Sequence, residues 1–379
     1  MALERCVISY VATFLPQEML HVYRQVKALR RYKTCVVTRR RRHEERFPFD
    51  PVIELHKPWY RGMKRLVNKV KGERVELSDA EVDQLLDVRE KLPGQLVHIY
   101  LGNEALRALP YLRRETAPRI VSFHGADLSS SFTREQFEKL EPYVRFFLCR
   151  SESLAHELTR RGCPRDRIRL NPTGVPLPEN SARSFYDAKG SRPLCLLQAS
   201  RFIAKKGLDA TVESVRLLRD TGIPAKLTLA GDGPLADELK QQCANLGIGE
   251  HVDFTGFLGF DRLQELYRTH DIFLHPSRVS EKGDREGIPN SLLEAMAHGM
   301  PAIATRHSGI PEAVDHGKDG WLIEGASGKA IADAVTSIID EPGKLASLSA
   351  NARAKVADRF STQRCGETLE RIYDEVLEG

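Results

Sequence analysis

The stretch Glu286-Gly-Ile-Pro-Asn-Ser-Leu-Leu-Glu294-Ala-Met-Ala-His-Gly-Met-Pro301 contains the start, the body and the end of one short helix. Pro289 is suited to the first helical position, after a two-residue loop. The helical pattern continues to His298 and gives way to Ala302–Thr305, an apolar run typical of a buried strand. A loop, a helix and a strand in this order predict one unit of an α/β fold.

The same alternation extends in both directions from this stretch. In the second half, strands are expected at Leu194–Ala199, Lys226–Ala230, Ile272–His275, Ala302–Thr305 and Trp321–Ile323, and helices at Leu208–Arg219, Pro234–Leu246, Arg262–Thr269 and Ser291–His298. In the first half, strands are expected at Cys6–Val11, Thr34–Thr38, Leu96–Tyr100, Ile120–Phe123 and Phe146–Leu148, with helices such as Gln17–Leu29 and Glu152–Arg161. Short apolar strands between amphipathic helices predict parallel sheets covered on both faces.

The chain divides near its middle. Asn171-Pro-Thr-Gly-Val-Pro-Leu-Pro178 has three prolines and a glycine in eight residues, and a polar stretch follows. We therefore expect a first domain at 1–180, a second at 190–360, and a C-terminal helix at 361–379 that leaves the second domain and crosses back to the first. Two doubly wound domains that face each other bind ligands in the cleft between them, at the carboxyl ends of both sheets.

Bulk properties exclude several classes of protein. The 379 residues are 41% hydrophobic and 29% charged, as in a globular enzyme, and no apolar run is long enough to cross a bilayer. The N-terminus lacks the layout of a signal peptide. Seven scattered cysteines without a C-x-x-C pair indicate a reduced, cytoplasmic protein without structural zinc. The net charge of +5 is compatible with anionic partners of any kind.

The quoted stretch also carries chemistry. Backbone amides from Asn290 onward, with Ser291 and Leu292, lie in a first helical turn and favour an anion such as a diphosphate. Glu294 lies about 8 Å along the helix from its start, and Glu286 lies in the loop on the other side of that anion site. The spacing suits a nucleotide-sugar, with one acid on sugar hydroxyls and the other on ribose. A capped amphipathic helix with incidental acids explains the pattern equally well.

A second segment, Ser200-Arg-Phe-Ile-Ala-Lys-Lys-Gly207, follows an expected strand. Arg201 and Lys206 stand five residues apart on a strand-to-helix loop closed by glycine. Two such cations are able to clamp a diphosphate from both sides, although a solvated basic loop is the simpler explanation of this segment in isolation.

Together these segments resemble the retaining GT-B glycosyltransferases of glycosyltransferase family 4, with their E-x7-E element. The likeness extends to Ser308-Gly-Ile-Pro-Glu-Ala-Val314 and is most specific across 193–325. It implies two Rossmann-like domains. It also implies that Glu286 contacts the donor sugar, Glu294 contacts the ribose, and Arg201 and Lys206 neutralise the leaving diphosphate, with adjacent Lys205 as a substitute for Lys206.

Further positions follow from the same resemblance. In Leu229-Ala-Gly-Asp-Gly-Pro234, Gly231 permits close approach of backbone and ligand, although a plain strand-to-helix turn explains the glycines nearly as well. Phe254-Thr-Gly-Phe-Leu-Gly259 ends another strand, and backbone groups around Phe257 and Leu258 match the family's base-binding loop. Gly287 and Ile288 enter the helix beside the donor. His124 follows a strand and is expected beside the donor sugar. Asp127 is expected to orient a hydroxyl or to cap the next turn.

Two features of the first half concern the acceptor side. The family's usual glycine-rich first loop is missing, because Val11-Ala-Thr-Phe-Leu-Pro16 has no glycine. Arg39–Arg42 is a run of four arginines, and residues 57–71 combine six basic residues with an apolar face at helical spacing. Residues 57–71 are typical of a membrane-surface helix, while an ordinary helix packed on the sheet explains them as well. No recognisable nucleic-acid module accompanies the charge.

These observations favour a retaining, metal-independent glycosyltransferase that needs no cofactor. The expected reaction moves a sugar from a nucleoside diphosphate sugar, UDP-sugar by family frequency, to a hydroxyl of a saccharide or lipid-linked acceptor. This activity belongs to cell-surface polysaccharide or glycolipid synthesis, in the cytoplasm or at the cytoplasmic membrane face. A nucleotide-sugar epimerase of the same architecture is the main alternative, and a non-catalytic nucleotide-sugar sensor is the other.

Overall fold

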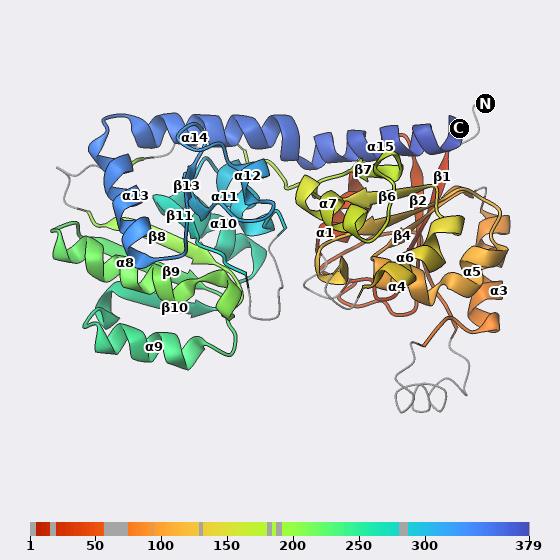
Figure 1. Ribbon diagram of the computed structural model, residues 1–379, viewed down its shortest axis with the longest axis horizontal. Coiled ribbons are helices and arrows are strands. Elements are labelled where there is room, and N and C mark those ends of the chain that lie inside the picture. The colour runs from red at the N-terminus through yellow and green to blue at the C-terminus, as the bar shows by residue number, and fades with distance from the viewer. Residues whose placement is uncertain are drawn as a thin grey trace. The chain divides into compact units, whose positions relative to one another are not determined.

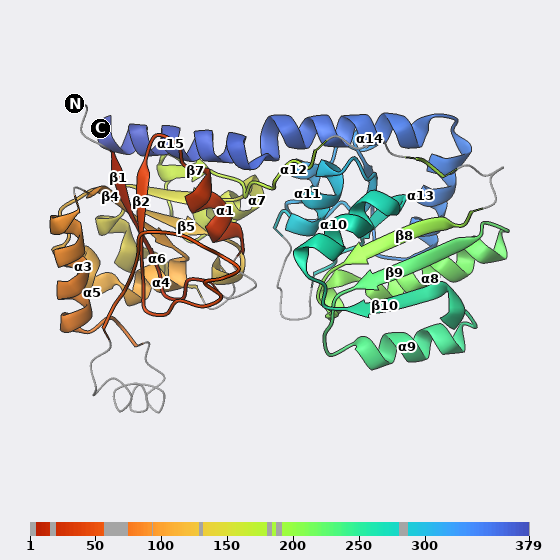
Figure 2. The same cartoon turned by 180° about the vertical axis from the view of Figure 1, so that it is seen from behind.

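The computed structural model describes residues 5–15, 20–56, 75–92, 94–128, 132–179, 184–186, 192–279 and 287–378. The chain forms two compact units, one of Met1–Gly174 with Thr362–Gly379 and one of Val175–Ser361. Figures 1 and 2 show each unit from two sides. The basic residues 57–71 and the acid Glu286 lie outside the described residues.

The first unit is built on a parallel sheet of seven strands in the order β3-β2-β1-β4-β5-β6-β7. The strands are β1 Cys6–Val11, β2 Lys33–Thr38, β3 Val52–Glu54, β4 Gly94–Tyr100, β5 Arg119–Phe123, β6 Phe146–Cys149 and β7 Ile168–Leu170. The helices are α1 Leu20–Ala28, α3 Asp79–Lys91, α4 Gly102–Arg107, α5 Leu109–Arg114, α6 Arg134–Leu140, α7 Glu152–Arg160 and α15 Thr362–Glu378. The strand order reverses direction between β1 and β4.

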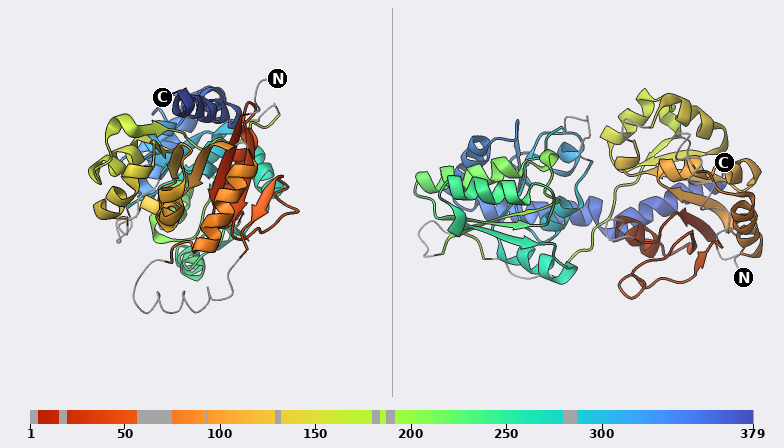
Figure 3. Two further views of the ribbon diagram at one scale, coloured as in Figure 1. Left: turned by 90° about the vertical axis from the view of Figure 1, so that its right-hand side faces the viewer. Right: turned by 90° about the horizontal axis from the view of Figure 1, so that it is seen from below.

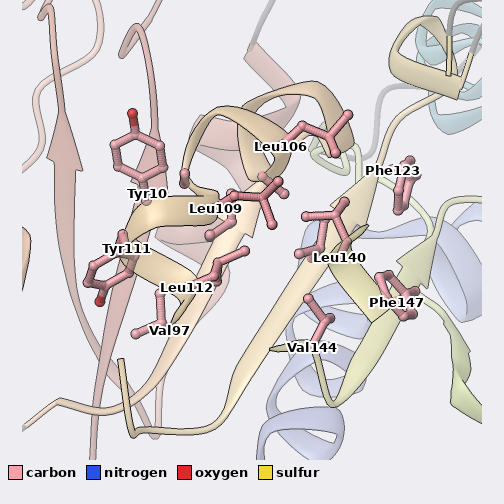
Figure 4. Packing of buried hydrophobic residues seen from close by; sticks show 14 of the residues in the cluster. Tyr10, Val97, Leu106, Leu109, Tyr111, Leu112, Phe123, Leu140, Val144 and Phe147 are labelled. Atoms are coloured by element: carbon pink, nitrogen blue, oxygen red, sulfur yellow. The ribbon is translucent and has the colours of Figure 1, made fainter. Parts of the chain in front are cut away.

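Alternate residues of these strands enter two different cores. Tyr10, Val97 and Phe123 pack with α4, α5 and α6 on one face of the sheet, as Figure 4 shows. Their chain neighbours point the other way, and Leu96 and Ile120 pack against helix α15. Both faces are therefore apolar, which explains why these strands appear in the sequence as continuous apolar runs.

Helix α15 is bound to the first unit by a polar contact as well as by its apolar face. Tyr373 places its hydroxyl 2.8 Å from Nδ1 of His98, whose Nε2 lies 2.5 Å from the Ser122 hydroxyl. Burial lowers the pKa of His98 to about 3, because a charged imidazole loses its hydration there. Glu370 accepts the backbone N–H groups of Arg30 and Arg31, both at 2.6 Å.

The second unit is built on a parallel sheet of six strands in the order β10-β9-β8-β11-β12-β13. The strands are β8 Leu194–Ala199, β9 Ala225–Ala230, β10 Val252–Gly256, β11 Ile272–His275, β12 Ala302–Thr305 and β13 Trp321–Ile323. The helices are α8 Leu208–Asp220, α9 Ala236–Asn245, α10 Phe260–Thr269, α11 Asn290–Ala297, α12 Ile310–Ala313, α13 Gly328–Asp340 and α14 Lys344–Lys355. Helices lie on both sides of this sheet (Figure 3).

The predicted α/β architecture with two parallel sheets is confirmed. Five predicted strands agree to the residue, among them Cys6–Val11 and Trp321–Ile323. The predictions missed β3 and β7, which are three residues long and only partly buried. Among the described residues, no helix is long and apolar enough to cross a membrane.

Candidate active site

The loop after β8 is held at the centre of the second sheet, where the strand order reverses. Its last residue, Gly207, has φ 63°. A Cβ atom there would lie 2.0 Å from the carbonyl oxygen of Pro276, just after the neighbouring strand β11. Only glycine permits this approach. The loop that carries Arg201 and Lys206 is therefore fixed at the carboxyl edge where open α/β sheets bind ligands.

The two cations of this loop differ in their surroundings. Arg201 is exposed, whereas Lys206 is 9% exposed. The Lys206 carbonyl accepts a 2.8 Å hydrogen bond from Gln198, a fully buried side chain of β8. Lys205, the alternative cation, is half-buried, and its carbonyl accepts the backbone N–H of Arg278 at 2.9 Å. Burial at the strand end favours Lys206 as the more rigidly placed charge.

The glycines after β9 pack against the β8 loop. Gly231 has φ 141° and Gly233 has φ 157°. Added Cβ atoms would meet the Ser200 carbonyl oxygen at 1.9 Å and the Phe202 carbonyl oxygen at 2.6 Å. The Phe202 amide also donates to the Asp232 carbonyl at 2.8 Å. These glycines thus let the β9 turn hold the loop on which Arg201 stands.

Helix α11 begins at Asn290 with Pro289 as its N-cap, so the proline lies one position before the predicted one. Ile288 and Leu292 are buried in the core beneath the helix start, whereas Asn290 and Ser291 are half-buried. Gly309 contacts the entering loop, because a Cβ there would lie 3.0 Å from the Gly287 carbonyl carbon. The helix start and its loop are therefore anchored from two sides.

Glu294 lies near the middle of α11 and is 8% exposed. The hydroxyl of Tyr267, a fully buried residue of α10, donates to one of its carboxylate oxygens at 3.3 Å. Sequence analysis did not single out Tyr267. Its only signal was a position on the apolar side of α10, which equally indicates a core residue.

The end of β10 exposes an aromatic side chain. Phe257 is 67% exposed, and its neighbour Leu258 is half-buried against the α10 and α11 core. The Gly256 carbonyl accepts the Gly231 amide at 2.9 Å. The β10 loop therefore joins the β9 turn, and through it the β8 loop, at one edge of the sheet.

In the first unit, His124 follows β5 and contacts a second histidine. Its ring centroid lies 4.6 Å from that of His21 on α1. Its two nitrogens are buried and make no hydrogen bond to any residue that the structure describes. Burial, followed by the nearby charges of His21 and Arg150, holds the pKa of His124 well below its usual value. Sequence analysis missed His21 because it falls inside the helical pattern of α1.

Asp127 has both carboxylate oxygens engaged. One accepts the backbone N–H groups of His124 at 2.8 Å and Gly125 at 2.9 Å, and the other accepts that of Gly102 at 2.8 Å. These contacts are to the residues just before Asp127 and to the first residue of α4, and none is to the turn that follows it. The carboxylate therefore joins two segments, the turn that contains His124 and the start of α4.

A family model described as "Glycosyl transferases group 1" matches residues 183–355, which contain the β8 loop and α11. The amylovoran biosynthesis glycosyltransferase AmsK of Erwinia amylovora is 32% identical over 73% of this chain and 70% of its own length. The chain belongs to this glycosyltransferase family. The predicted glycosyltransferase family is thereby confirmed, whereas retention of configuration and membership of family 4 stay predictions.

A further relative and a solved structure are similar to this glycosyltransferase. A GDP-mannose-dependent alpha-(1-6)-phosphatidylinositol monomannoside mannosyltransferase of Mycobacterium tuberculosis is 30% identical over 79% of the chain and 74% of that protein. The crystal structure of Anabaena Alr3699/HepE in complex with UDP superposes with a TM-score of 0.74, at 16% identity, over 98% of this chain and all of that one. The likeness confirms the GT-B fold class, with two Rossmann-like domains.

Proposed function

We propose that this glycosyltransferase moves a sugar from a nucleoside diphosphate sugar to a hydroxyl of a saccharide or lipid-linked acceptor, with retention of anomeric configuration. The observation that carries the proposal is the β8 loop. It holds Arg201 and Lys206 at the switch point of the second sheet, where Gly207 packs so closely on Pro276 that an added Cβ would lie 2.0 Å from the Pro276 carbonyl oxygen.

In this proposal the pair Arg201 and Lys206, which we call the clamp, supplies the main catalytic effect. When the bond between the anomeric carbon and the diphosphate breaks, negative charge grows on the leaving oxygens. Arg201, Lys206 and the first-turn amides of α11 from Asn290 onward stabilise that charge without further reorganisation. Glu294 holds the ribose hydroxyls, Glu286 and His124 contact the transferred sugar, and Phe257 and Leu258 lie beside the base.

The proposed chemistry is a front-face substitution. The acceptor oxygen bonds to the anomeric carbon on the side from which the diphosphate leaves, and the acceptor proton passes to the leaving phosphate oxygen. No enzyme nucleophile and no metal ion is required in this scheme. Among the described residues, no group of three or more His, Cys, Asp and Glu side chains is arranged to hold a metal, and independence from metals remains a prediction.

The names of the relatives support a role in cell-surface polysaccharide or glycolipid synthesis. UDP-sugars are the donors that we propose first. GDP-mannose is the necessary comparison, since it is the donor named for the mycobacterial relative. A lipid-linked acceptor would bring the protein to the cytoplasmic membrane face, where residues 57–71 are the proposed contact.

The test is incubation with UDP-glucose, UDP-galactose or GDP-mannose, each with and without neutral, phosphorylated and carboxylated octyl glycosides, in the presence of EDTA. We expect a glycoside product that keeps the donor's anomeric configuration by NMR. Isomerised donor formed without acceptor would indicate the epimerase instead. A product of inverted configuration, or a requirement for added metal, would contradict the mechanism.

A further inference from the structure

The run Arg39–Arg42 is not used by the donor site, yet it has a defined place in the first unit. It continues β2 beyond Thr38, alongside the loop that continues β1. Phe14 donates its amide to the Arg40 carbonyl at 2.8 Å, and the Arg42 amide donates to the Phe14 carbonyl at 2.7 Å. Phe14 and Arg41 form a parallel β-bridge. The arginines therefore extend the sheet at its carboxyl edge.

The four arginines alternate in their surroundings, as expected for extended chain. Arg39 and Arg41 are half-buried. Arg39 lies 3.5 Å from the Glu104 carboxylate, and Arg41 donates to the Phe49 carbonyl at 2.8 Å. Arg40 and Arg42 are exposed, and neither side chain hydrogen-bonds or ion-pairs with any described residue. Two exposed cations thus share one face, roughly 6.5 Å apart along the chain.

The register of the sheet relates this pair to His124. Thr38 pairs with Val11. Tyr10, which precedes Val11, pairs with Ile99. Tyr100, which follows Ile99, pairs with Ser122. Arg40 and His124 each lie two residues beyond this row, so they extend equally far past the edge of the sheet.

The separation across the sheet is set by the strand order β2-β1-β4-β5. Three strand spacings correspond to about 14 Å, comparable to the length of a disaccharide or of a sugar diphosphate. The switch point between β1 and β4 lies between the two ends of this span. An acceptor that reaches from His124 to the arginines would cross the switch point with about one sugar unit between them.

We propose that Arg40 and Arg42 bind an anionic group of the acceptor, a phosphate, a diphosphate or a sugar carboxylate, about one sugar unit from the hydroxyl that reacts at His124. The inference rests on the proposed function, in which His124 lies beside the transferred sugar. Planar guanidinium groups pair with the oxygens of either kind of anion. The first loop, Val11–Pro16, has no glycine and so does not offer a close backbone contact. Ionic contacts between the two arginines and an anionic acceptor take the place of that contact.

The first test measures equilibrium binding of three octyl hexosides of one sugar, one neutral, one linked through diphosphate and one oxidised to the uronate. The proteins are wild type, R40Q/R42Q, R201A, and R113Q/R268Q as a control that removes two exposed arginines elsewhere. We expect at least one anionic ligand to bind wild type about tenfold more tightly than the neutral one, as for charge-assisted contacts. This advantage disappears in R40Q/R42Q only and weakens with salt.

Three outcomes overturn the inference. These are equal binding of neutral and anionic ligands to wild type, loss of the advantage in R201A with retention in R40Q/R42Q, and equal loss in the control. The second outcome would place the diphosphate at the donor clamp. The preferred ligand, diphosphate or uronate, identifies the source of the anion.

Turnover separates this inference from the proposed function. Transfer from nucleotide-sugar to neutral and anionic hexosides, with no preference for charge and no effect of R40Q/R42Q, would overturn only the anionic subsite. If wild type neither transfers nor hydrolyses any donor, the proposed function itself fails. We expect R40Q/R42Q to raise the acceptor KM about tenfold while the donor KM stays unchanged.

Discussion

The two units have the same strand order around their switch points but form the carboxyl edge differently. In the second unit, Gly207, Gly231 and Gly233 bring backbone segments so close that no Cβ would fit. In the first unit, Gly125 has φ 112° with open space around it, and the close approach at Gly102 is to the side chain of Phe123 and not to backbone. Its edge is formed by side chains, namely His21, His124 and the arginines after β2.

The difference indicates different ligands. Every nucleoside diphosphate sugar carries the same diphosphate, and a rigid loop with fixed charges is suited to a group that does not change from donor to donor. Acceptors vary from enzyme to enzyme, and side chains change more easily than a glycine-dependent backbone. We therefore interpret the second unit as the half of the enzyme that supplies the chemistry and the first unit as the half that sets specificity.

The largest effect is expected from the clamp. Arg201→Ala or Lys206→Met should each lower kcat at least about 100-fold, the scale for losing one preorganised donor to a developing negative charge. Steady-state transfer assays provide the measurement, with Lys205→Met as the matched control. Near-normal turnover in both clamp variants, or an equal loss in Lys205→Met, would remove the assignment.

The second prediction concerns the rigidity of the β8 loop. Gly207→Ala and Gly222→Ala both place alanine at positive φ, which costs about 1 kcal/mol each. Only position 207 also meets a carbonyl oxygen, which should add about 1–3 kcal/mol. Urea unfolding of both variants measures the difference in apparent free energy of unfolding. Equal destabilisation would show that the close contact with Pro276 has no energetic weight.

The third prediction concerns pH and the first unit. The folded pKa of His98 is about 3, below the ordinary value of 6.5, so the folded state resists protonation. The contribution of neutral His98 to the free energy of unfolding is therefore complete above about pH 6.5. It is lost as pH falls toward 3, and the loss amounts to about 2 kcal/mol at about pH 5. The measurement is urea unfolding of wild type and His98→Gln at about pH 7 and at about pH 5, which gives the free energy of unfolding that each protein loses between them. An identical loss in both proteins would contradict the buried neutral histidine.

The smallest effect is expected at the proposed ribose contact. Glu294→Gln should raise the donor KM about tenfold, because a charge-assisted hydrogen bond becomes a neutral one. Its kcat should change little. Tyr267→Phe, which removes the 3.3 Å hydrogen bond to the carboxylate, should raise the KM less. An unchanged donor KM in Glu294→Gln would eliminate the ribose assignment.

The architecture was predictable because parallel strands buried on both faces leave clear apolar runs, as at Cys6–Val11. The segments proposed for the donor were visible in the sequence too, since Arg201, Lys206 and Glu294 lie in short continuous motifs, and their roles stay predictions. The contacts of Gly207 and Gly231 were not, because they depend on which strands become neighbours. Nothing in the order of the residues shows that Pro276 follows the strand beside β8.

The first unit was harder to interpret for a related reason. His21 and His124 are about a hundred residues apart in sequence, and each is an ordinary residue in its own segment. The run Arg39–Arg42 was visible, but its division into two paired and two exposed arginines depends on the β-bridge with Phe14. Sites assembled from single side chains on separate elements leave little local signal.

The most direct test of the division between the two halves is calorimetric titration of UDP and GDP into wild type, R201A and R40Q/R42Q. We predict that the preferred nucleotide binds wild type and R40Q/R42Q with equal affinity and binds R201A at least about tenfold more weakly. Unchanged nucleotide affinity in R201A, or a loss confined to R40Q/R42Q, would contradict the assignment of the diphosphate to the second unit.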